Sequence, residues 1–370
     1  MQSERDEQEA LFNYYFRDQE LKYETKLTNL DTEATVPKWR IPYAAAIHPE
    51  ARGGLSSTRG LGGRTGQIGR RRPDDARPRG ASPLKIYDQA FNAGQDLANS
   101  YERRRIMGTD RALFPALRMR LASESWEGYC SGFTGSTIKH PEPIKPVDAS
   151  RVGGASGVVF QPSDIKALLT CIYNRTTDDS YLFLAPPSAR DEGPNMGTFH
   201  LALANYIGQA GHPIGIDRTK GRTSWNNPVY AYKINSIEDA GGDGDVRYKT
   251  LETTITYTNY GSDASRQTDL STGARVGNPK QSMTCRYTLA LDNEGRIVGG
   301  RALSSSGHFL WIPLYAVQGK EDGSVPGNPY VDVRKVIALA RESSFSEIQQ
   351  KFDAATIGPM IDPALGSPAD

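Results

Sequence analysis

The chain has 370 residues, too many for a mini-protein or a simple repeat module, and its composition excludes further classes. Its 44 Lys and Arg residues balance 43 Asp and Glu residues, so a net charge of +1 offers no overall field for binding nucleic acid or an anionic membrane. No run of apolar residues is long enough to predict a membrane-spanning helix, and three cysteines cannot form a disulfide scaffold.

The amino-terminal third alternates between helical and irregular segments. Apolar residues recur at helical spacing between Leu11 and Phe16, which predicts a helix within residues 4–27. Residues 52–80 contain eight Arg and eight Gly but no Lys or Glu, and they have little to bury. Such a stretch is typical of a mobile loop or linker. Arginine-rich tracts can also contact RNA, phosphate or an acidic partner, but this one has no aromatic residue on which a base could stack, which favours the linker.

Three helices are predicted next. Ser82 is a good cap with proline behind it, and apolar residues repeat on one face from there to Tyr101. A short helix is expected within residues 124–139, because prolines at 141 and 143 end it. A third helix, 163–174, has apolar residues at i, i+3, i+4 and i+7, and we expect it to pack against the short one.

The second half of the chain is rich in predicted strands. Residues 198–207 and 213–218 are separated by a Gly-rich turn, which is typical of an antiparallel hairpin. Two helices, at 330–341 and near 344–353, follow the last strand. Helices first and a mostly antiparallel sheet afterwards predict an α+β fold. Further strands are predicted at 228–235, 246–260, 283–291 and 296–302.

The order of three residues is typical of a cysteine acyl-transfer site. Such a site needs a thiol at a helix amino terminus, a histidine to pair with it and a carboxylate to orient the histidine. Cys130 lies at the start of the short helix, His200 on the first strand of the predicted hairpin and Asp217 on the second. Neighbouring strands would bring His200 and Asp217 within hydrogen-bonding reach. Taken singly, each of the three is more often a structural residue.

The other candidate sites are weaker. Cys171 lies on the apolar face of helix 163–174 and Cys285 lies in a strand, so both are predicted to be structural, and only Cys130 is predicted to be a free, reactive thiol. The remaining histidines are scattered singly, without the spacing of a metal site. The acidic stretch from Asp239 to Asp245 lacks the downstream Glu of an EF-hand and is predicted to be a hairpin loop.

Four blocks of sequence resemble the transglutaminase elicitor family of oomycetes and its bacterial relatives. Trp225-Asn226-Asn227-Pro228-Val229 is similar to the Trp-Asn-Gln-Pro-Val core of the peptide by which plants perceive these elicitors. Ser131 and Asn227 depart from the family pattern, but neither belongs to the triad. The blocks are WEGYCSGFTGSTIKHPEPIKPV (126–147), VVFQPSDIKALLTCIY (158–173), GTFHLALANYIG (197–208) and IGIDRTKGRTSWNNPVYAYKI (214–234).

This resemblance implies a papain-like fold, with a nucleophile helix packed on an antiparallel sheet, and protein-glutamine γ-glutamyltransfer without a cofactor. By motif match, the Cys-His-Asp triad falls on Cys130, His200 and Asp217. The substrates would be proteins or peptides that carry glutamine, with lysine or a small amine as acceptor. A place outside the cytoplasm, secreted or periplasmic, is the expectation, although no export signal is visible at the amino terminus. For the oxyanion, the backbone N–H of Cys130 and the indole N–H of Trp126 are the expected donors.

The expected organisation has four parts, and two other functions remain open. Residues 1–51 form a helical segment, 52–81 a linker or loop, 82–320 the catalytic domain, and 321–370 carboxyl-terminal helices and a tail. Residues 1–80 could act as a pro-segment or lid. The same triad would serve a papain-type protease or amidase with water as acceptor. A secreted recognition or structural module with a vestigial triad is the alternative of another class, and it predicts an unreactive Cys130.

Overall fold

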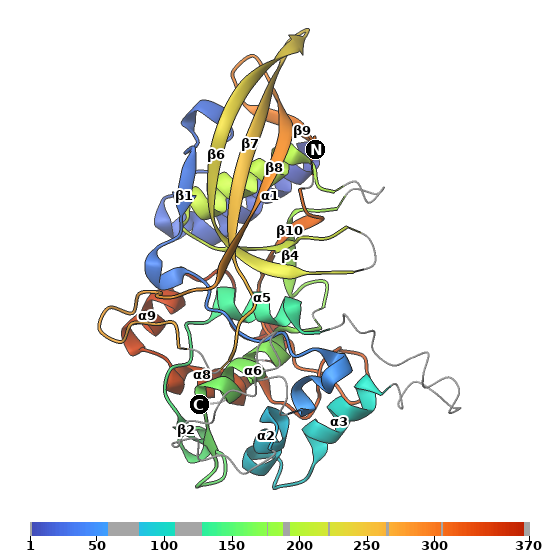
Figure 1. Cartoon of the computed structure of the whole chain (residues 1–370), viewed down its shortest axis with the longest axis vertical. Coiled ribbons are helices and arrows are strands. Elements are labelled where there is room, and N and C mark those ends of the chain that lie inside the picture. Colours follow the sequence, from blue (N-terminus) through green and yellow to red (C-terminus); the bar gives the residue numbers. More distant parts are fainter. Residues whose placement is uncertain are drawn as a thin grey trace.

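An antiparallel sheet forms one half of the molecule and a group of helices forms the other (Figure 1). The computed structural model describes residues 2–57, 81–107, 128–175, 177–187, 193–220, 223–263, 266–304 and 306–365. Most of the Arg- and Gly-rich segment and Trp126 lie outside these ranges, so the predictions made for them stay predictions. The α+β class predicted from the sequence is confirmed.

Five strands of the large sheet, β5 to β9, were predicted from the sequence, whereas β1, β4 and β10 were not. Among the described residues, eight strands pair in the order β4-β10-β5-β6-β7-β8-β9, with β1 added beside β6, and every pair is antiparallel. Side chains of the inner part of β7 alternate between buried and partly exposed, as expected where one face of a strand covers a core. The strands are β1 (Glu33–Thr35), β4 (Tyr181–Ala185), β5 (Ile214–Asp217), β6 (Asn226–Asp243), β7 (Val246–Thr258), β8 (Lys280–Leu291), β9 (Ile297–Ala302) and β10 (Phe309–Pro313), while β2 (Val147–Asp148) and β3 (Val159–Phe160) form a separate small pair.

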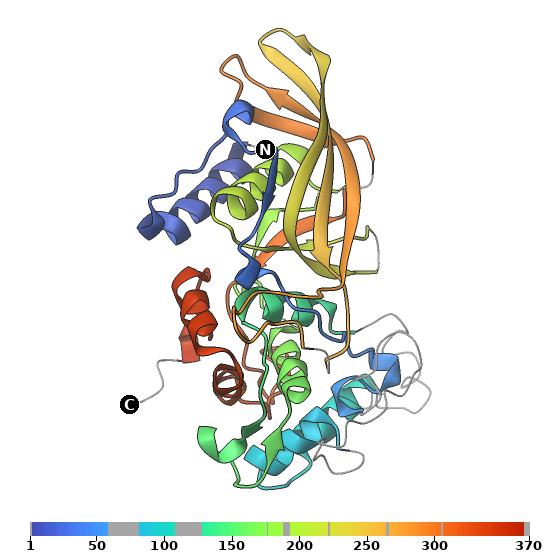
Figure 2. The same cartoon turned by 60° about the vertical axis from the view of Figure 1, so that its left-hand side comes forward.

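Two helices cover one face of the large sheet (Figure 2). Helix α7 (Met196–Ala202) contacts β4, β8 and β9, and it continues as a π-helical segment, Leu203–Gln209. Helix α1 (Gln2–Phe16) packs on α7, with Phe12 and Phe16 in the core between helices and sheet. The predicted amino-terminal helix therefore exists, but it ends well before residue 27.

The prediction of a strand at 198–207 is wrong, because α7 and its π-helical continuation occupy these residues. The residues from Met196 to Ile207 are buried and mostly apolar, so the sequence shows no helical period. The Asn195 side chain accepts a hydrogen bond from the Gly197 N–H at 2.8 Å and caps the helix. The predicted hairpin is therefore a helix followed by β5.

The helical half has its own core of apolar side chains. Ser82 caps α2 as predicted, with its hydroxyl accepting from the Lys85 N–H. The long helix predicted from there to Tyr101 is instead two helices, because Ala93 and Gly94 both have positive φ and break the chain. The helices are α2 (Pro83–Phe91), α3 (Leu97–Ile106), α5 (Cys130–Lys139), α6 (Pro162–Tyr173), α8 (Val333–Ser343) and α9 (Ser346–Ala355).

Helix α5 lies where the two halves meet (Figure 1). It packs against α6 on one side and against the ends of β5, β6 and β10 on the other. A side chain at Gly132 would place its Cβ 2.1 Å from the Thr170 carbonyl oxygen, so the two helices approach closely only because this residue is glycine. The packing of the short helix on 163–174 is confirmed. The first residue of α5 thereby faces the ends of three strands.

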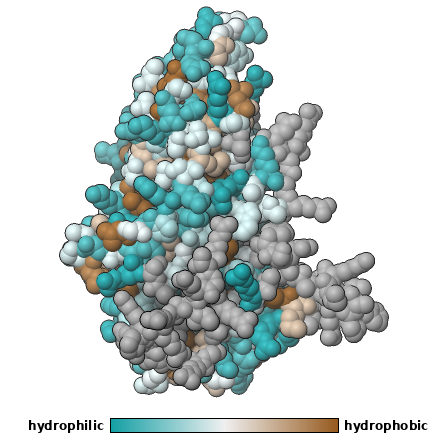
Figure 3. All heavy atoms as spheres, in the orientation of Figure 1, coloured by the Kyte–Doolittle hydropathy of each residue, from teal (hydrophilic) through white to brown (hydrophobic). Residues whose placement is uncertain are grey.

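The face of the molecule seen in Figure 3 is largely hydrophilic, with apolar side chains in small, separated groups. Within the ranges given above, no helix combines the length and apolar composition that crossing a lipid bilayer requires.

Candidate functional site

Cys130 is the first residue of α5 and carries a free thiol. Its sulfur donates to the Ser224 carbonyl oxygen at 3.4 Å and lies 3.8 Å from the Asn226 side-chain nitrogen. Both partners come from the chain segment that enters β6, so the nucleophile helix and the sheet meet at this sulfur. As predicted, the cysteine lies at a helix amino terminus.

The electrostatic surroundings of Cys130 raise the pKa of its thiol. Burial is the main cause, and the charge of Asp217 adds to it. Hydrogen bonds from Asn226 and from the Ser131 N–H favour the thiolate but do not outweigh burial. At neutral pH the resting thiol therefore carries its proton, whereas the helix terminus alone would have favoured the anion.

Asp217, the last residue of β5, is fixed by a cluster of donors. Oδ1 accepts hydrogen bonds from the Thr219 N–H and hydroxyl, both at 3.1 Å, and from the Trp225 N–H at 2.9 Å. Oδ2 accepts from the Ser224 hydroxyl at 3.0 Å. The carboxylate is buried, so these donors replace water around its charge and hold its position.

His308 is the imidazole that faces this carboxylate. Its Nδ1 lies 3.7 Å from Asp217 Oδ2, and its backbone N–H donates to the Asp217 carbonyl at 2.8 Å. Gly307, with φ of +77°, turns the chain immediately before β10, where Phe309 pairs with Asp217. The ring is partly exposed. Cys130, Asp217 and His308 thus come from α5, β5 and the residue directly before β10.

The prediction that His200 pairs with Asp217 is wrong in this structure. His200 lies in α7, where its Nδ1 contacts the Tyr287 hydroxyl at 2.7 Å and its Nε2 has no hydrogen-bond partner among the described residues. Burial lowers its pKa to about 4, so the ring is neutral at physiological pH. Because residues 198–207 form a helix, the hairpin that would have joined His200 to Asp217 does not exist.

The sequence contained one signal for His308. It follows a glycine and directly precedes FLWIP, a short apolar run typical of a buried strand, and it gives the chain order Cys, Asp, His. Cys171 and Cys285 are buried free thiols in α6 and β8, as expected of structural residues. Nothing in the sequence indicated a role for Asn226, apart from its position in the segment 225–229 that resembles the elicitor peptide.

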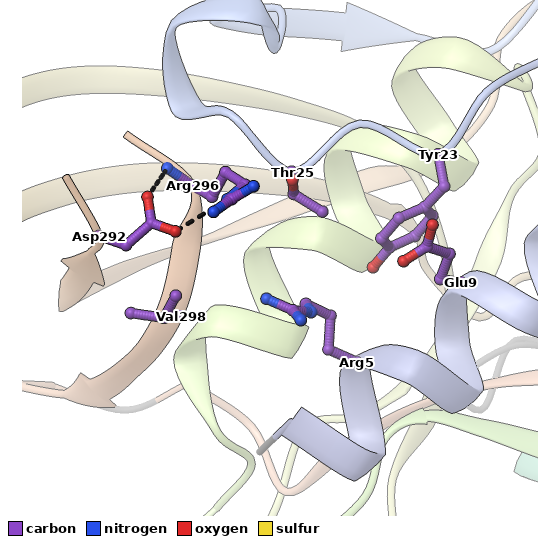
Figure 4. A pocket seen from close by; sticks show the side chains of 7 residues that line it. All are labelled: Arg5, Glu9, Tyr23, Thr25, Asp292, Arg296 and Val298. Carbon is purple, nitrogen blue, oxygen red and sulfur yellow. Dashed lines mark hydrogen bonds and ion pairs between the residues drawn. The ribbon is translucent and has the colours of Figure 1, made fainter. Parts of the chain in front are cut away.

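Two cavities of the described part of the chain lie elsewhere. One, of about 510 Å³, opens between α1 and the turn from β8 to β9, where Arg5 faces an Asp292–Arg296 ion pair (Figure 4). The other, of about 460 Å³, lies beside α3. Neither is lined by Cys130, Asp217 or His308, so it is the convergence of reactive side chains that marks the candidate site.

The described ranges contain no group of three or more His, Cys, Asp or Glu side chains placed to hold a metal ion. The acidic stretch ending at Asp245 forms the exposed tip of the hairpin between β6 and β7.

Comparison with known proteins gives this arrangement a family. The model of the transglutaminase elicitor family matches residues 120–343, which include Cys130, Asp217 and His308. The crystal structure of the GP42 transglutaminase from Phytophthora sojae superposes with a TM-score of 0.59 at 19% identity, covering 91% of this chain and 98% of that one. At 19% identity this similarity shows that the two proteins share a fold. No curated protein sequence matches the chain significantly. With the family match spanning more than half of its length, the chain belongs to the transglutaminase elicitor family.

Proposed function

We propose that the protein is a protein-glutamine γ-glutamyltransferase that uses Cys130 as nucleophile, His308 as acid and base, and Asp217 to orient His308. The observation that carries this proposal is the contact of His308 with Asp217 beside a free cysteine at a helix amino terminus. Membership of the transglutaminase elicitor family supports the reaction type. His308 takes the role that the sequence assigned to His200.

In the first step, the Cys130 sulfur attacks the γ-carboxamide carbon of a substrate glutamine. Because the resting thiol is protonated, His308 accepts its proton during the attack. The S–C bond forms, an oxyanion develops, and the C–N bond then breaks as His308 returns the proton to the departing ammonia. Asp217 faces Nδ1, so it holds the ring and stabilises its cationic form, and proton exchange falls to Nε2.

In the second step, the thioester reacts with an amine. A lysine ε-amine or a small primary amine attacks the acyl carbon while His308 accepts a proton, the C–S bond breaks, and the proton returns to the Cys130 sulfur. The product is an isopeptide bond, or an amine joined to the glutamine side chain. Water in place of the amine would give glutamate, which is deamidation.

The test is to incubate the full chain with a glutamine-containing protein and a biotin-labelled primary amine. We expect incorporation by the wild type and by Cys285→Ala, which removes a thiol from β8, separated from β6 by β7, but none by Cys130→Ala. Mass spectrometry should locate the amine on glutamine. New amino termini without amine incorporation would instead establish a protease. A wild type that acts on neither bond would favour a recognition module with a vestigial triad.

A further inference from the structure

We propose that the side-chain amide of Asn226 donates a hydrogen bond to the oxyanion during acyl transfer, and that Trp311 positions it. This inference rests on the proposed function, because it assigns a role within the same reaction. Trp126, the donor expected from the sequence, lies outside the described residues.

Asn226 lies on the face of the sheet that carries the other reactive groups. It pairs directly with Asp217 across β5 and β6, and directly paired residues point to the same face. Its Nδ2 is 3.8 Å from the Cys130 sulfur, and its side chain is almost completely buried. An amide N–H therefore lies next to the atom to which the acyl carbon would become bonded.

The orientation of this amide follows from its partners. The Trp311 indole nitrogen lies 2.9 Å from Asn226 Oδ1, and because an indole N–H only donates, the amide must turn its oxygen toward Trp311. Nδ2 then faces the sulfur and also donates to the Ser224 hydroxyl at 2.9 Å. Ser224 in turn donates to Asp217, which links the amide to the proposed triad through one hydroxyl.

Two further contacts keep the arrangement rigid. The Tyr260 hydroxyl donates to the backbone carbonyl oxygen of Asn226 at 2.9 Å. The Trp311 ring lies over Gly215, its partner across β10 and β5, and a Cβ at Gly215 would lie 2.5 Å from the indole nitrogen. Glycine at this position therefore makes room for the ring that orients Asn226.

These contacts fit the needs of an acyl-transfer oxyanion. A preorganised donor stabilises charge that develops in the transition state without the cost of reorienting at that moment. The amide of Asn226 is fixed by Trp311 and Ser224 before any substrate binds. The backbone N–H at the start of α5 supplies the second donor, since the first N–H groups of a helix have no partner within it.

The test compares two reactions of Cys130, of which one forms an oxyanion and the other does not. Acylation of Cys130 by p-nitrophenyl acetate passes through a tetrahedral oxyanion, whereas alkylation by iodoacetamide is a direct displacement at carbon. Both rates would be measured on the full chain at their high-pH plateaus, so that a change in thiol pKa cannot mimic the effect. Asn226→Ala, Trp311→Phe and, as a control on the same strand, the exposed Asn235→Ala would be compared with wild type.

We expect Asn226→Ala to lower the acylation rate about 10²- to 10³-fold while the alkylation plateau stays close to wild type. Trp311→Phe should lower acylation less, since the amide is present but no longer held, and Asn235→Ala should change neither rate. Equal losses in acylation and alkylation by Asn226→Ala, or unchanged acylation, would overturn the inference. Acylation by the ester needs no glutamine, so a wild type that fails to use glutamine would refute the proposed function and leave this test intact.

Discussion

Asp217 is the residue around which the candidate site is organised. Four donor groups on Thr219, Ser224 and Trp225 bind its two oxygens, and all three residues lie in the connection from β5 to β6. A carboxylate held in this way keeps its direction when a neighbouring imidazole gains or loses a proton. His308 is the imidazole in that position.

The first prediction concerns which histidine acts in the proposed triad, His308 or His200. His308→Ala should lower kcat for amine incorporation, measured per folded molecule, about 10²- to 10⁴-fold, the range expected for loss of a general acid and base. His200→Ala should leave kcat per folded molecule close to wild type. It should lower the free energy of unfolding by about 1–3 kcal/mol, because it removes a buried partner of Tyr287.

Urea unfolding and steady-state kinetics on both variants check this prediction. If His200→Ala folds normally but loses activity, the result would contradict this prediction and favour His200 as the triad histidine.

The raised pKa of the Cys130 thiol gives the second prediction. A raised pKa means less thiolate at a given pH, so alkylation by iodoacetamide should be slower than for free cysteine at pH 7 and should still increase above pH about 8.5. The rate would be followed from pH 5 to 10, with Cys130→Ala to subtract labelling of the two other thiols. A plateau reached below pH 7 would contradict it. Slow labelling at neutral pH therefore does not distinguish an enzyme from a vestigial site.

At the scale of the element, α5 and α6 pack closely. Gly132 leaves no room for a methyl group against the Thr170 carbonyl, and Gly135 packs against the Tyr173 ring. This packing holds Cys130, the first residue of α5, at the ends of the strands that α5 contacts.

Gly132→Ala tests this contact. The added methyl should force α5 away from α6, lower the free energy of unfolding by about 1–3 kcal/mol, and reduce amine incorporation by displacing the sulfur. Ser136→Ala on the same helix adds no volume and should retain activity. Chemical denaturation and the amine assay report the two effects. Wild-type values of both for Gly132→Ala would show that the helices can separate without consequence.

The segment 196–209 shows why one element was misread. Its apolar residues satisfy an alternating pattern as well as a helical one, because few polar residues separate them. Charged residues separate the apolar ones in α6, which is buried along most of its length, and in α8, and both helices were predicted close to their observed ends. Periodicity identifies an element only where polar residues separate its apolar ones.

At the scale of the whole molecule, the amino-terminal segment is built into the sheet half. Phe12 and Phe16 are buried against Tyr206 of the helical layer, and the Gln8 side chain donates to the Leu184 and Thr198 carbonyls. Farther along, β1 pairs with β6. Removing residues 1–80 to test for a lid would therefore also expose the core.

A pair of substitutions in α1 tests this anchoring. Phe12→Ala should lower the free energy of unfolding by about 3–5 kcal/mol, as for other large buried aromatic residues. Tyr14→Ala, two residues away and 62% exposed, should change it by about 0.5 kcal/mol or less. Thermal or urea unfolding of the full chain provides both values. Equal, small effects would mean that α1 contributes little to the folded state and could act as a separable segment.

Residues 225–229, which resemble the core of the peptide perceived by plants, are integrated into the folded protein. Asn226 through Val229 are buried in the folded chain, and Asn226 contacts the Cys130 sulfur. A receptor that reads these side chains would need them exposed by proteolysis or unfolding. Within the folded protein, Asn226 contacts the candidate nucleophile, and the Trp225 N–H donates to Asp217.

The sequence by itself determined the α+β class, five of the eight strands of the large sheet, most helices, the family, the free thiol at the start of α5 and the position of Asp217 at the end of β5. These features depend on local signals: the spacing of polar and apolar residues, caps, turns and short motifs. Only the tertiary structure decided which histidine faces Asp217 and which amide faces Cys130. His308 reaches Asp217 through the pairing of β10 with β5, where the paired residues Phe309 and Asp217 are 92 positions apart. Asn226 pairs with Asp217 close by in the chain, but it meets Cys130 of α5, which is 96 positions away. Contacts over such separations leave no local trace in the chain.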